Sequence, residues 1–464
     1  MKDDATICAI ATAPGMGAIA VLRLSGNDAI AIADSVYRSP NKAKKLTDQP
    51  ANTLHYGSIE YDGKTLDDAI FALFKQPHSY TGEDVVEITC HGSVYIQQQV
   101  LQALTQSGAR LAEPGEFTLR AFLNGKMDLS QAEAVADLIA SESGAAHKMA
   151  MKQMRGGFSA EIGRLREQLL HLCSLLELEL DFSEEDVEFA DRTALKRLLE
   201  EIHNVMAHLT SSFSLGNVIK IGVPVAIVGK PNVGKSTLLN TLLQEEKAIV
   251  SEIAGTTRDA IEDVINIKGI RFRFIDTAGI RQTTDTIESL GIERTFSKIS
   301  EASVVLLLAE AKCSKDEIQQ QITALNLTPE QNLVIIINKI DLYNETEIIQ
   351  KLGGKDAFAP YPVLFLSAKH HLHTNNLHDL LLDTVQSQAL QTSDVVVSNA
   401  RHYEALQNAL EASNRALSGL DTSLPSDLIA QDIREILHYL GQITGEITTD
   451  EILGNIFKNF CIGK

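Results

Sequence analysis

A glycine-rich loop that ends in a lysine and a serine occupies residues 229–236, GKPNVGKS, and fits the pattern GxxxxGK[ST]. Glycines in such a loop let main-chain N–H groups turn around a phosphate, with the N-terminus of a helix behind them. Lys235 can then reach the β- and γ-phosphates, and the Ser236 hydroxyl can ligate Mg²⁺. The context favours this interpretation, because we expect an apolar strand over 223–228 before the loop and a helix over 235–243 after it.

Two further motifs have the chemistry that phosphate transfer needs. DTAG at 276–279 follows an expected strand over 270–275, so Asp276 can hold a Mg²⁺-bound water and the Gly279 N–H can sense a γ-phosphate. Between this motif and the phosphate loop, GTTRD at 255–259 supplies hydroxyls, of which we assign Thr257 to the magnesium shell. Each motif alone is weak evidence, but their order along the chain makes the set specific.

A fourth motif, NKID at 338–341, predicts which base is bound. An ionised aspartate only accepts hydrogen bonds, so Asp341 can take both the N1–H and the exocyclic amine of guanine. Adenine lacks that donor pair and would leave a buried carboxylate unpaired. Ser-Ala-Lys at 367–369 can place a backbone N–H on guanine O6. The sequence therefore predicts a guanine nucleotide site, with these contact residues: Asn232, Val233, Gly234, Lys235, Ser236, Thr237, Ser251, Glu252, Ile253, Ala254, Gly255, Thr256, Thr257, Asp276, Thr277, Ala278, Gly279, Asn338, Lys339, Asp341, Ser367, Ala368 and Lys369.

The residue that activates water is less evident. Ras-type proteins have a glutamine directly after DxxG, and here that position is Ile280, which cannot hydrogen-bond to water. Glu288, at the start of an expected helix over 288–299, is a candidate substitute that would act together with the catalytic Lys235, although an exposed acid at a helix N-terminus explains it equally well. Arg258 and Arg281 are candidate arginine fingers. The amide oxygen of Asn232 could instead help to hold a monovalent cation.

Composition limits the class of protein. A chain of 464 residues needs more than one domain, and no segment has the run of roughly 18 apolar residues that a membrane span requires. The formal net charge of −20 argues against a general polyanion binder, and the acidic start MKDD is unlike a targeting peptide, which predicts a cytoplasmic protein. The 5 cysteines are scattered, so neither a disulfide framework nor a zinc site is expected.

The chain that must position these motifs has three kinds of region, which differ in the spacing of their apolar residues. Residues 1–120 mix short β-like runs, such as 18–24, 69–74 and 84–89, with turns and one helix over 96–104, which predicts an α+β domain. Residues 219–386 alternate apolar strands with helices, as in a doubly wound parallel sheet, and the strands are expected over 223–228, 304–308, 333–337 and 363–366. Residues 121–218 and 387–464 have helical periodicity, including an apolar stripe over 429–440, and we expect them to form one helical domain into which the α/β domain is inserted. Residues 211–217 have the composition of a linker.

Together these motifs resemble the MnmE (TrmE) family of tRNA-modification GTPases, within the TrmE-Era-EngA-like group. The segments that carry the resemblance are GKPNVGKS, AGTTRD, DTAGIR, NKID, SAK, ATAPGMGAIAVLRLSG, YTGEDVVEITCHG, PGEFTLRAFLNGKMDLSQAEAV and the terminal CIGK. The last four are far more diagnostic than the GTPase motifs, and the resemblance spans nearly the whole chain.

The resemblance implies a folate-binding N-terminal domain that forms a homodimer, a helical domain and an inserted G domain. It implies potassium-stimulated GTP hydrolysis, with K⁺ held by Asn232, Ser251, Ile253 and Thr256. It also implies Mg²⁺ on Ser236 and Thr257, with Glu288 as the catalytic carboxylate. A 5-formyl-tetrahydrofolate would contact Arg23, Glu87, Lys126 and Lys464. Such proteins act on tRNA with an MnmG-type flavoprotein, in a heterotetramer, to modify the wobble uridine U34 at C5.

Several readings stay open at this point. A ribosome-assembly GTPase of the Era/Der type shares the G motifs, and a switch protein without chemistry of its own is a third class. The tail Cys461–Lys464 is either a frayed terminus or, if the apolar stripe before it docks, part of a site where Cys461 acts as nucleophile or acid/base. Arg110 and Arg120 are either anion ligands or helix caps. The histidines at 370–378 are read as a solvated loop, not as metal ligands.

Overall fold

The structure is a computed structural model that describes residues 4–41, 44–181, 192–247, 263–275, 299, 301–329, 331–354, 356–389, 396–422, 424–458 and 460–464. The chain divides into two compact units. Unit 1 comprises 1–140, 150–202 and 408–464, and unit 2 comprises 141–149 and 203–407. The predicted fold class is confirmed, since the chain combines an α+β part, a set of long helices and an α/β part with a phosphate loop. The three predicted domain boundaries stay a prediction.

The first part of unit 1 is a seven-stranded sheet in the order β3-β4-β5-β6-β2-β1-β7. Its β1–β7 pair is parallel, and its other neighbouring strands are antiparallel. Alternation of apolar residues puts Leu22, Phe71 and Ile88 on one face, where helices α1 and α2 bury them. The elements are β1 (Ile7–Ile10), β2 (Ile19–Ser25), α1 (Ala29–Val36), β3 (Tyr37–Arg38), β4 (Thr53–Tyr61), β5 (Lys64–Phe74), β6 (Val85–His91), α2 (Val94–Gln106) and β7 (Arg110–Leu111).

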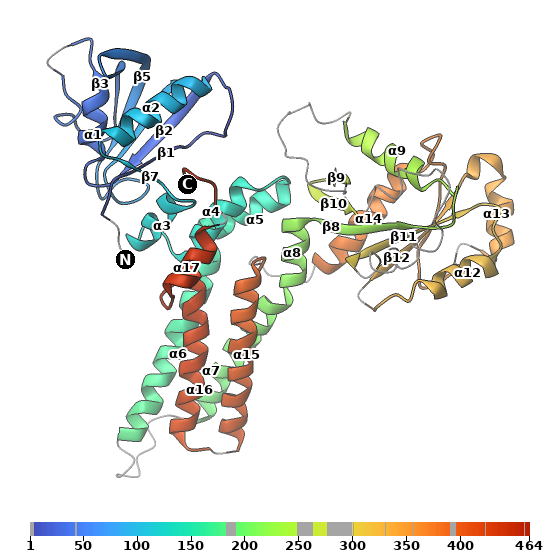
Figure 1. Ribbon diagram of the computed structural model, residues 1–464. Coiled ribbons are helices and arrows are strands. Elements are labelled where there is room, and N and C mark those ends of the chain that lie inside the picture. The colour runs from blue at the N-terminus through green and yellow to red at the C-terminus, as the bar shows by residue number, and fades with distance from the viewer. Residues whose placement is uncertain are drawn as a thin grey trace. The chain divides into compact units, whose positions relative to one another are not determined.

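The rest of unit 1 is helical (Figure 1). Helices from both ends of the sequence pack together, because α16 lies against both α4 and α6. The apolar stripe predicted for residues 429–440 is buried along α16. Figure 1 shows α16 alongside α6. The helices that lie wholly or partly in this unit are α3 (Glu116–Leu123), α4 (Leu129–Ile139), α5 (Gly144–Met154), α6 (Gly157–Asp181), α7 (Arg192–Ser211), α15 (Ala400–Asp421), α16 (Ser426–Thr444) and α17 (Asp450–Phe457).

Unit 2 contains a six-stranded sheet in the order β13-β12-β11-β8-β10-β9, parallel except for β9. Apart from polar residues at the ends of β11 and β12, its central strands are apolar because helices cover both faces. The strands expected from sequence all form, within two residues of the predicted ends. The elements are α8 (Phe213–Ile221), β8 (Val223–Val228), α9 (Lys235–Lys247), β9 (Asp263–Ile267), β10 (Ile270–Phe274), β11 (Val304–Glu310), α12 (Lys315–Ala324), β12 (Asn332–Asn338), η2 (Ile340–Leu342), α13 (Glu345–Leu352), β13 (Val363–Phe365) and α14 (Thr374–Ala389).

The linker predicted over residues 211–217 is wrong, because most of it lies in helix α8. Tertiary contacts override its composition. The buried Ser212 hydroxyl donates to the Leu209 carbonyl at 2.6 Å and accepts the N–H of Val397 at 3.0 Å. Phe213 stacks on Tyr403 with ring centroids 4.3 Å apart. Val397 and Tyr403 lie about 190 residues further along the chain, so the local sequence could not indicate these two contacts.

The five cysteines are free, with Cys461 exposed and Cys8, Cys90, Cys173 and Cys313 buried. Within the described ranges, no helix has the length and apolarity needed to cross a membrane.

Candidate functional site

Three of the predicted nucleotide motifs meet at one edge of the unit 2 sheet. The phosphate loop follows β8, NKID begins at the end of β12, and SAK follows β13. These strands are parallel, so their carboxyl ends lie at the same edge. Strand order changes direction at β8, whose neighbours are β10 and β11, and ligands of open α/β sheets bind at such a point.

The phosphate loop is closed on itself by its lysine. The Lys235 ammonium group donates to the carbonyls of Gly229 at 2.7 Å and Lys230 at 3.0 Å. Burial lowers the pKa of Lys235 below its ordinary value. An added Cβ on Gly234, whose φ is +102°, would overlap the side-chain amide of Asn338, so only glycine fits there. Ser236 is half-buried at the start of α9, where its hydroxyl oxygen suits a hard cation such as Mg²⁺.

Asn338 joins the phosphate loop to the two base motifs. Its side chain is 2% exposed. The amide nitrogen donates to the carbonyl of Val233 at 2.8 Å, and the amide oxygen accepts the N–H of Ala368 at 3.1 Å. The Thr241 hydroxyl on α9 donates to the carbonyl of Ala368 at 2.8 Å. One buried amide thus fixes the spacing between the expected phosphate site and the expected base site.

Asp341, the expected guanine ligand, lies beside Ser367. The Ser367 hydroxyl donates to Asp341 Oδ1 at 2.5 Å, and His370 Nε2 lies 3.6 Å from Oδ2. The hydrogen bond from Ser367 holds the pKa of Asp341 below its ordinary value, so this carboxyl is ionised at neutral pH. Sequence reasoning placed His370 in a solvated loop. Its side chain is half exposed, yet it also flanks the base site.

Several predicted site residues lie outside the residues that the structure describes. They are the potassium and magnesium loop 251–257, the DTAG motif 276–279 and Glu288, together with Arg258, Ile280 and Arg281. Their roles stay predictions. Among the residues that are described, no group of three or more His, Cys, Asp or Glu side chains is arranged to hold a metal ion, the histidines at 370–378 included.

A second polar site lies on the unit 1 sheet, on the face opposite α1 and α2. Arg23 on β2 and Glu87 on β6 are direct partners in the antiparallel register. The Arg23 Nε donates to Glu87 Oε1 at 2.9 Å, and Nη2 lies 2.8 Å from the same oxygen. The Arg23 guanidinium carbon lies 5.4 Å from the ring centre of Tyr80 and 5.7 Å from that of Phe117. Tyr80 and Phe117 were not singled out from the sequence, although they lie in the quoted YTGED and PGEF motifs.

The C-terminal tail reaches this site. The carbonyl of Gly463 accepts a hydrogen bond of 3.3 Å from Arg23 Nη1. Upstream, Leu453, Phe457 and Phe460 are buried against α4, as the predicted apolar stripe requires. Lys464 is half-buried, and its N–H donates to the carbonyl of Cys461 at 3.3 Å. The frayed-terminus interpretation is therefore wrong.

Lys126, the remaining expected folate residue, belongs to the same region without joining the Arg23 cluster. Its ammonium group donates to the carbonyl of Pro77 at 2.9 Å. Its aliphatic stem packs along Gly82, in the loop that also carries Tyr80. The structure thus brings Arg23, Glu87 and the tail together and places Lys126 on the neighbouring loop.

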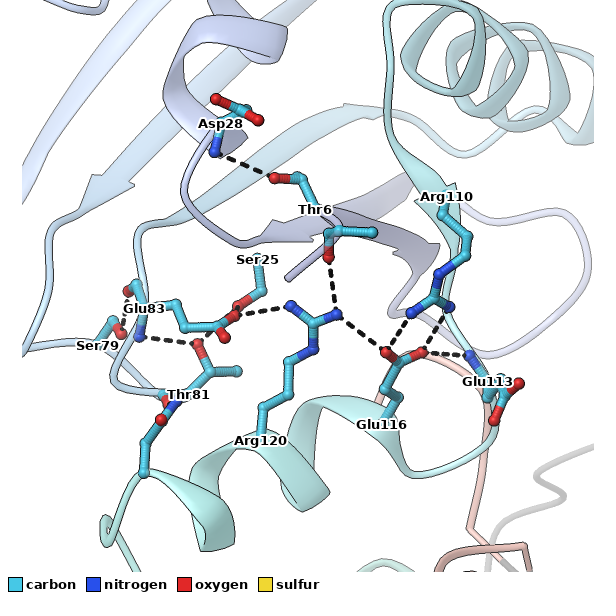
Figure 2. A network of polar contacts seen from close by, with 12 residues as sticks. Thr6, Ser25, Asp28, Ser79, Thr81, Glu83, Arg110, Glu113, Glu116 and Arg120 are labelled. Carbon is cyan, nitrogen blue, oxygen red and sulfur yellow. Dashed lines mark hydrogen bonds and ion pairs between the residues drawn. The ribbon is translucent and has the colours of Figure 1, made fainter. Parts of the chain in front are cut away.

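A buried ion-pair network fastens helix α3 to that loop (Figure 2). Arg120, 6% exposed, lies between Glu83 and Glu116, with N–O distances of 3.0 Å to each. Arg110 Nη2 lies 2.7 Å from Glu116. Burial alone would raise the pKa of Glu116, but hydrogen bonds from Arg110, the Glu113 N–H and Arg120 bring it below the ordinary value. Arg110 and Arg120, for which the sequence left anion binding and helix capping as alternatives, thus both pair with carboxylates of the protein itself.

The same network sets the two rings beside Arg23. The Thr118 and Tyr80 hydroxyls are hydrogen-bonded at 2.9 Å, and Asn124 Nδ2 donates to the carbonyl of Thr81 at 2.7 Å. Phe117 lies next to Glu116 on α3, so fixing the helix also fixes Phe117. A planar, partly anionic molecule would find a cation and the partly exposed ring of Tyr80 here, whereas the Phe117 ring is fully buried.

Comparison with known proteins shows the family to which this chain belongs. A family model described as the N-terminus of the GTP-binding protein TrmE matches residues 6–126, and one described as the MnmE helical domain matches residues 129–461. Proteins named tRNA modification GTPase MnmE are 55% identical in Flavobacterium johnsoniae and 56% identical in Flavobacterium psychrophilum. These alignments cover 100% of both chains in the first case and 99% of both in the second. The chain therefore belongs to the MnmE family of tRNA modification GTPases.

Proposed function

We propose that this GTPase acts in the cytoplasm with an MnmG-type flavoprotein, in a heterotetramer, to modify the wobble uridine U34 of certain tRNAs at C5. A 5-formyl-tetrahydrofolate, or a related one-carbon folate, supplies the one-carbon unit. GTP hydrolysis drives or times the reaction. The net charge of −20 is consistent with a flavoprotein partner that provides much of the tRNA-binding surface.

The nucleotide part of the proposal rests on the joined motifs of unit 2. Asp341 accepts the two N–H donors of guanine, and the neighbouring Ser-Ala-Lys loop, residues 367–369, places a backbone N–H on guanine O6. Lys235 changes partners from the loop carbonyls to the β- and γ-phosphates. Ser236 and Thr257 would hold Mg²⁺, which would neutralise negative charge on the phosphates. Glu288 orients the attacking water.

Potassium is assigned to Asn232, Ser251, Ile253 and Thr256. Of these residues, Asn232 is described, and it is exposed at the phosphate loop with a φ of +61°. Asparagine tolerates that backbone conformation better than most residues, so its amide can be presented there without strain. When bound, a cation at this position supplies positive charge near the phosphates, in place of an arginine finger.

One observation carries the one-carbon part of the proposal: the Arg23–Glu87 pair and the last residues of the chain lie in one place. Arg23 and Lys464 suit the glutamate carboxylates of a folate, and the partly exposed Tyr80 ring suits its flat pterin. Cys461 is exposed and lies two residues before Gly463, and we assign its thiol to the one-carbon unit. Glu87 holds the Arg23 guanidinium in position, and Lys126 adds a positive charge on the adjoining loop.

The proposed homodimer is supported by an apolar surface on the unit 1 sheet. Tyr56 on β4 and Ile70 on β5 are register partners on the face opposite α1 and α2, and they are 59% and 43% exposed. Leu54, two residues from Tyr56, is 71% exposed on the same face. Exposed apolar residues that gather in this way favour contact with another protein surface, here a second copy of the same face.

The two other classes of function are less well supported. An Era/Der-type assembly GTPase should carry an RNA-binding domain or a second G domain, whereas residues 6–126 and 129–461 match TrmE and MnmE models. A switch without chemistry would not need its C-terminal tail held against the Arg23 cation.

The proposal is tested by mass-spectrometric nucleoside analysis of tRNA from a strain that lacks this protein. The C5-modified wobble uridine should disappear and return with the wild-type gene. Isothermal titration of the purified protein with 5-formyl-tetrahydrofolate should show binding that Arg23→Ala removes. Unaltered tRNA nucleosides in the deletion strain would reject the proposed function.

A further inference from the structure

Glu310 ends strand β11 and lies between two lysines. Its side chain is 11% exposed. The Lys312 ammonium group lies 2.6 Å from Oε2, and the Lys339 ammonium group pairs with Oε1. Hydrogen bonds from Lys312 and then Lys339 hold the pKa of Glu310 below its ordinary value, so the group is a carboxylate at neutral pH. The predictions from sequence gave Glu310 no part in the nucleotide site.

Lys339 connects Glu310 to the phosphate loop. The same ammonium group that pairs with Glu310 donates to the main-chain carbonyl of Asn232 at 2.7 Å. Lys339 and Asn232 both have positive φ, +65° and +61°. Non-glycine residues keep this conformation only where their surroundings hold it. The Lys339 ammonium group therefore connects the base loop to the phosphate loop, and both residues that it links have positive φ.

A lysine by itself holds a neighbouring loop only weakly, because its ammonium group sits on a flexible four-carbon stem. A fixed carboxylate strengthens the contact, since it restricts the ammonium group to one position and neutralises its charge. We propose that Glu310 is a positioning residue for the GTPase reaction: it holds Lys339 against Asn232, so that the base loop and the phosphate loop are correctly spaced before GTP binds. Glu310 acts through Lys339 and does not touch the nucleotide. This inference rests on the assignment of NKID and the phosphate loop to GTP.

Lys312 provides the matched control. It pairs with the same carboxylate, but its side chain is 67% exposed and belongs to the segment that leads into α12. A general loss of charge around Glu310 would affect both lysines equally. A positioning role predicts that nucleotide affinity depends on the Glu310–Lys339 ion pair and not on the Glu310–Lys312 ion pair.

The test is a double-mutant cycle on the full-length protein, with Kd for GDP and for a non-hydrolysable GTP analogue measured by fluorescence titration. Glu310→Gln should raise both Kd values about tenfold, the effect expected when one charged contact is lost. In a Lys339→Met background, Glu310→Gln should add no further change, because its only route to the site is gone. Lys312→Met should leave Kd within about twofold of wild type, a change below the tenfold that marks 1.4 kcal/mol.

A split between binding and turnover separates positioning from a general structural role. The kcat of Glu310→Gln at saturating GTP should match that of wild type, since the loops are correctly spaced once nucleotide is bound. If Glu310→Gln does not fold, Glu310→Asp replaces it, because the shorter carboxylate withdraws from Lys339 and should raise Kd in the same direction.

Unchanged Kd in Glu310→Gln, or equal losses in the wild-type and Lys339→Met backgrounds, would overturn the inference. Failure of the GTP-site assignment gives a different result, in which Lys339→Met and Asp341→Asn both leave GTP affinity unchanged.

Discussion

The main-chain carbonyl of Gly463 accepts a hydrogen bond of 3.3 Å from Arg23, a residue 440 positions earlier in the chain. Gly463 has a φ of +94°, and an added Cβ would overlap the carbonyl oxygen of Ile10 on β1. The tail can therefore pass this close to the sheet only as glycine. Both ends of unit 1 thus contribute to one site, and the contact can be broken without deleting the tail.

Gly463→Ala should displace the tail, abolish tRNA modification in cells and weaken 5-formyl-tetrahydrofolate binding, while GTP hydrolysis stays near the wild-type rate. Gly454→Ala is the matched control, because a Cβ there meets open space on α17. Deletion of residues 461–464 should reproduce the Gly463→Ala result, and Cys461→Ser isolates the thiol. Normal levels of modified tRNA in the deletion variant would show that the tail has no part in the active site.

Asp341→Asn should exchange guanine for xanthine specificity. The new side-chain amide donates a hydrogen bond where the carboxylate accepted one. Its N–H therefore faces the exocyclic amine of guanine, which is also a donor, and the two cannot pair. The same N–H can donate to the 2-oxo group of xanthine. GTP affinity should fall by about 2–4 kcal/mol, the cost of an unpaired buried donor and acceptor, while xanthosine triphosphate affinity rises. Competitive nucleotide titration measures both. Wild-type GTP affinity in this variant would contradict the assigned base site.

Potassium should accelerate GTP hydrolysis, and sodium at the same ionic strength should not. Asn232→Gly tests the cation's ligand more cleanly than alanine, because glycine keeps the positive φ and the carbonyl that Lys339 holds, yet removes the amide. The variant should bind GTP normally and lose the difference between the two salts. Equal wild-type rates in potassium and sodium would remove the basis for a potassium site.

Glu288→Gln should lower kcat for GTP hydrolysis by about 100-fold, a typical contribution of a general base or water-orienting group, with GTP affinity nearly unchanged. The reason is that the proposed contact forms only in the transition state. Single-turnover hydrolysis with separately measured Kd values gives the two effects. A fully active Glu288→Gln would transfer the role to another residue.

Glu116 should make the stability of unit 1 depend on acid pH. Its pKa is lowered in the folded protein, so it contributes stability that is fully present above its unfolded pKa of about 4.3. That stability is lost as the pH falls through the lowered folded value. Glu116→Gln should cost about 2 kcal/mol at pH 7, because Arg110 and Arg120 lose a charged partner.

Denaturant titrations followed by circular dichroism at pH 7 and at lower pH measure this effect. The difference in the free energy of unfolding between Glu116→Gln and wild type should narrow as the pH falls below about 4. A constant difference across that range would show that the carboxylate charge is not what stabilises the network in Figure 2.

The sequence by itself determined the nucleotide motifs, their order and the strands that carry them. These features are local: a phosphate loop needs its glycines and lysine within eight residues, and a buried parallel strand is a short apolar run. For the same reason β8, β11 and β12 could be placed to within two residues. The apolar stripe before the tail likewise predicted that the C-terminus is docked, although not where.

Only the tertiary structure decided which distant residues meet. Glu310 looks like an ordinary strand-end acid until β11 and β12 are paired and Lys339 lies against it. Tyr80 and Phe117 become neighbours of Arg23 only when α3 is fastened to the sheet by Arg120. Residues 211–217 have a linker's composition and form a helix because Val397 and Tyr403 pack on them. Contacts of this kind depend on packing between segments far apart in the chain, which local residue patterns do not encode.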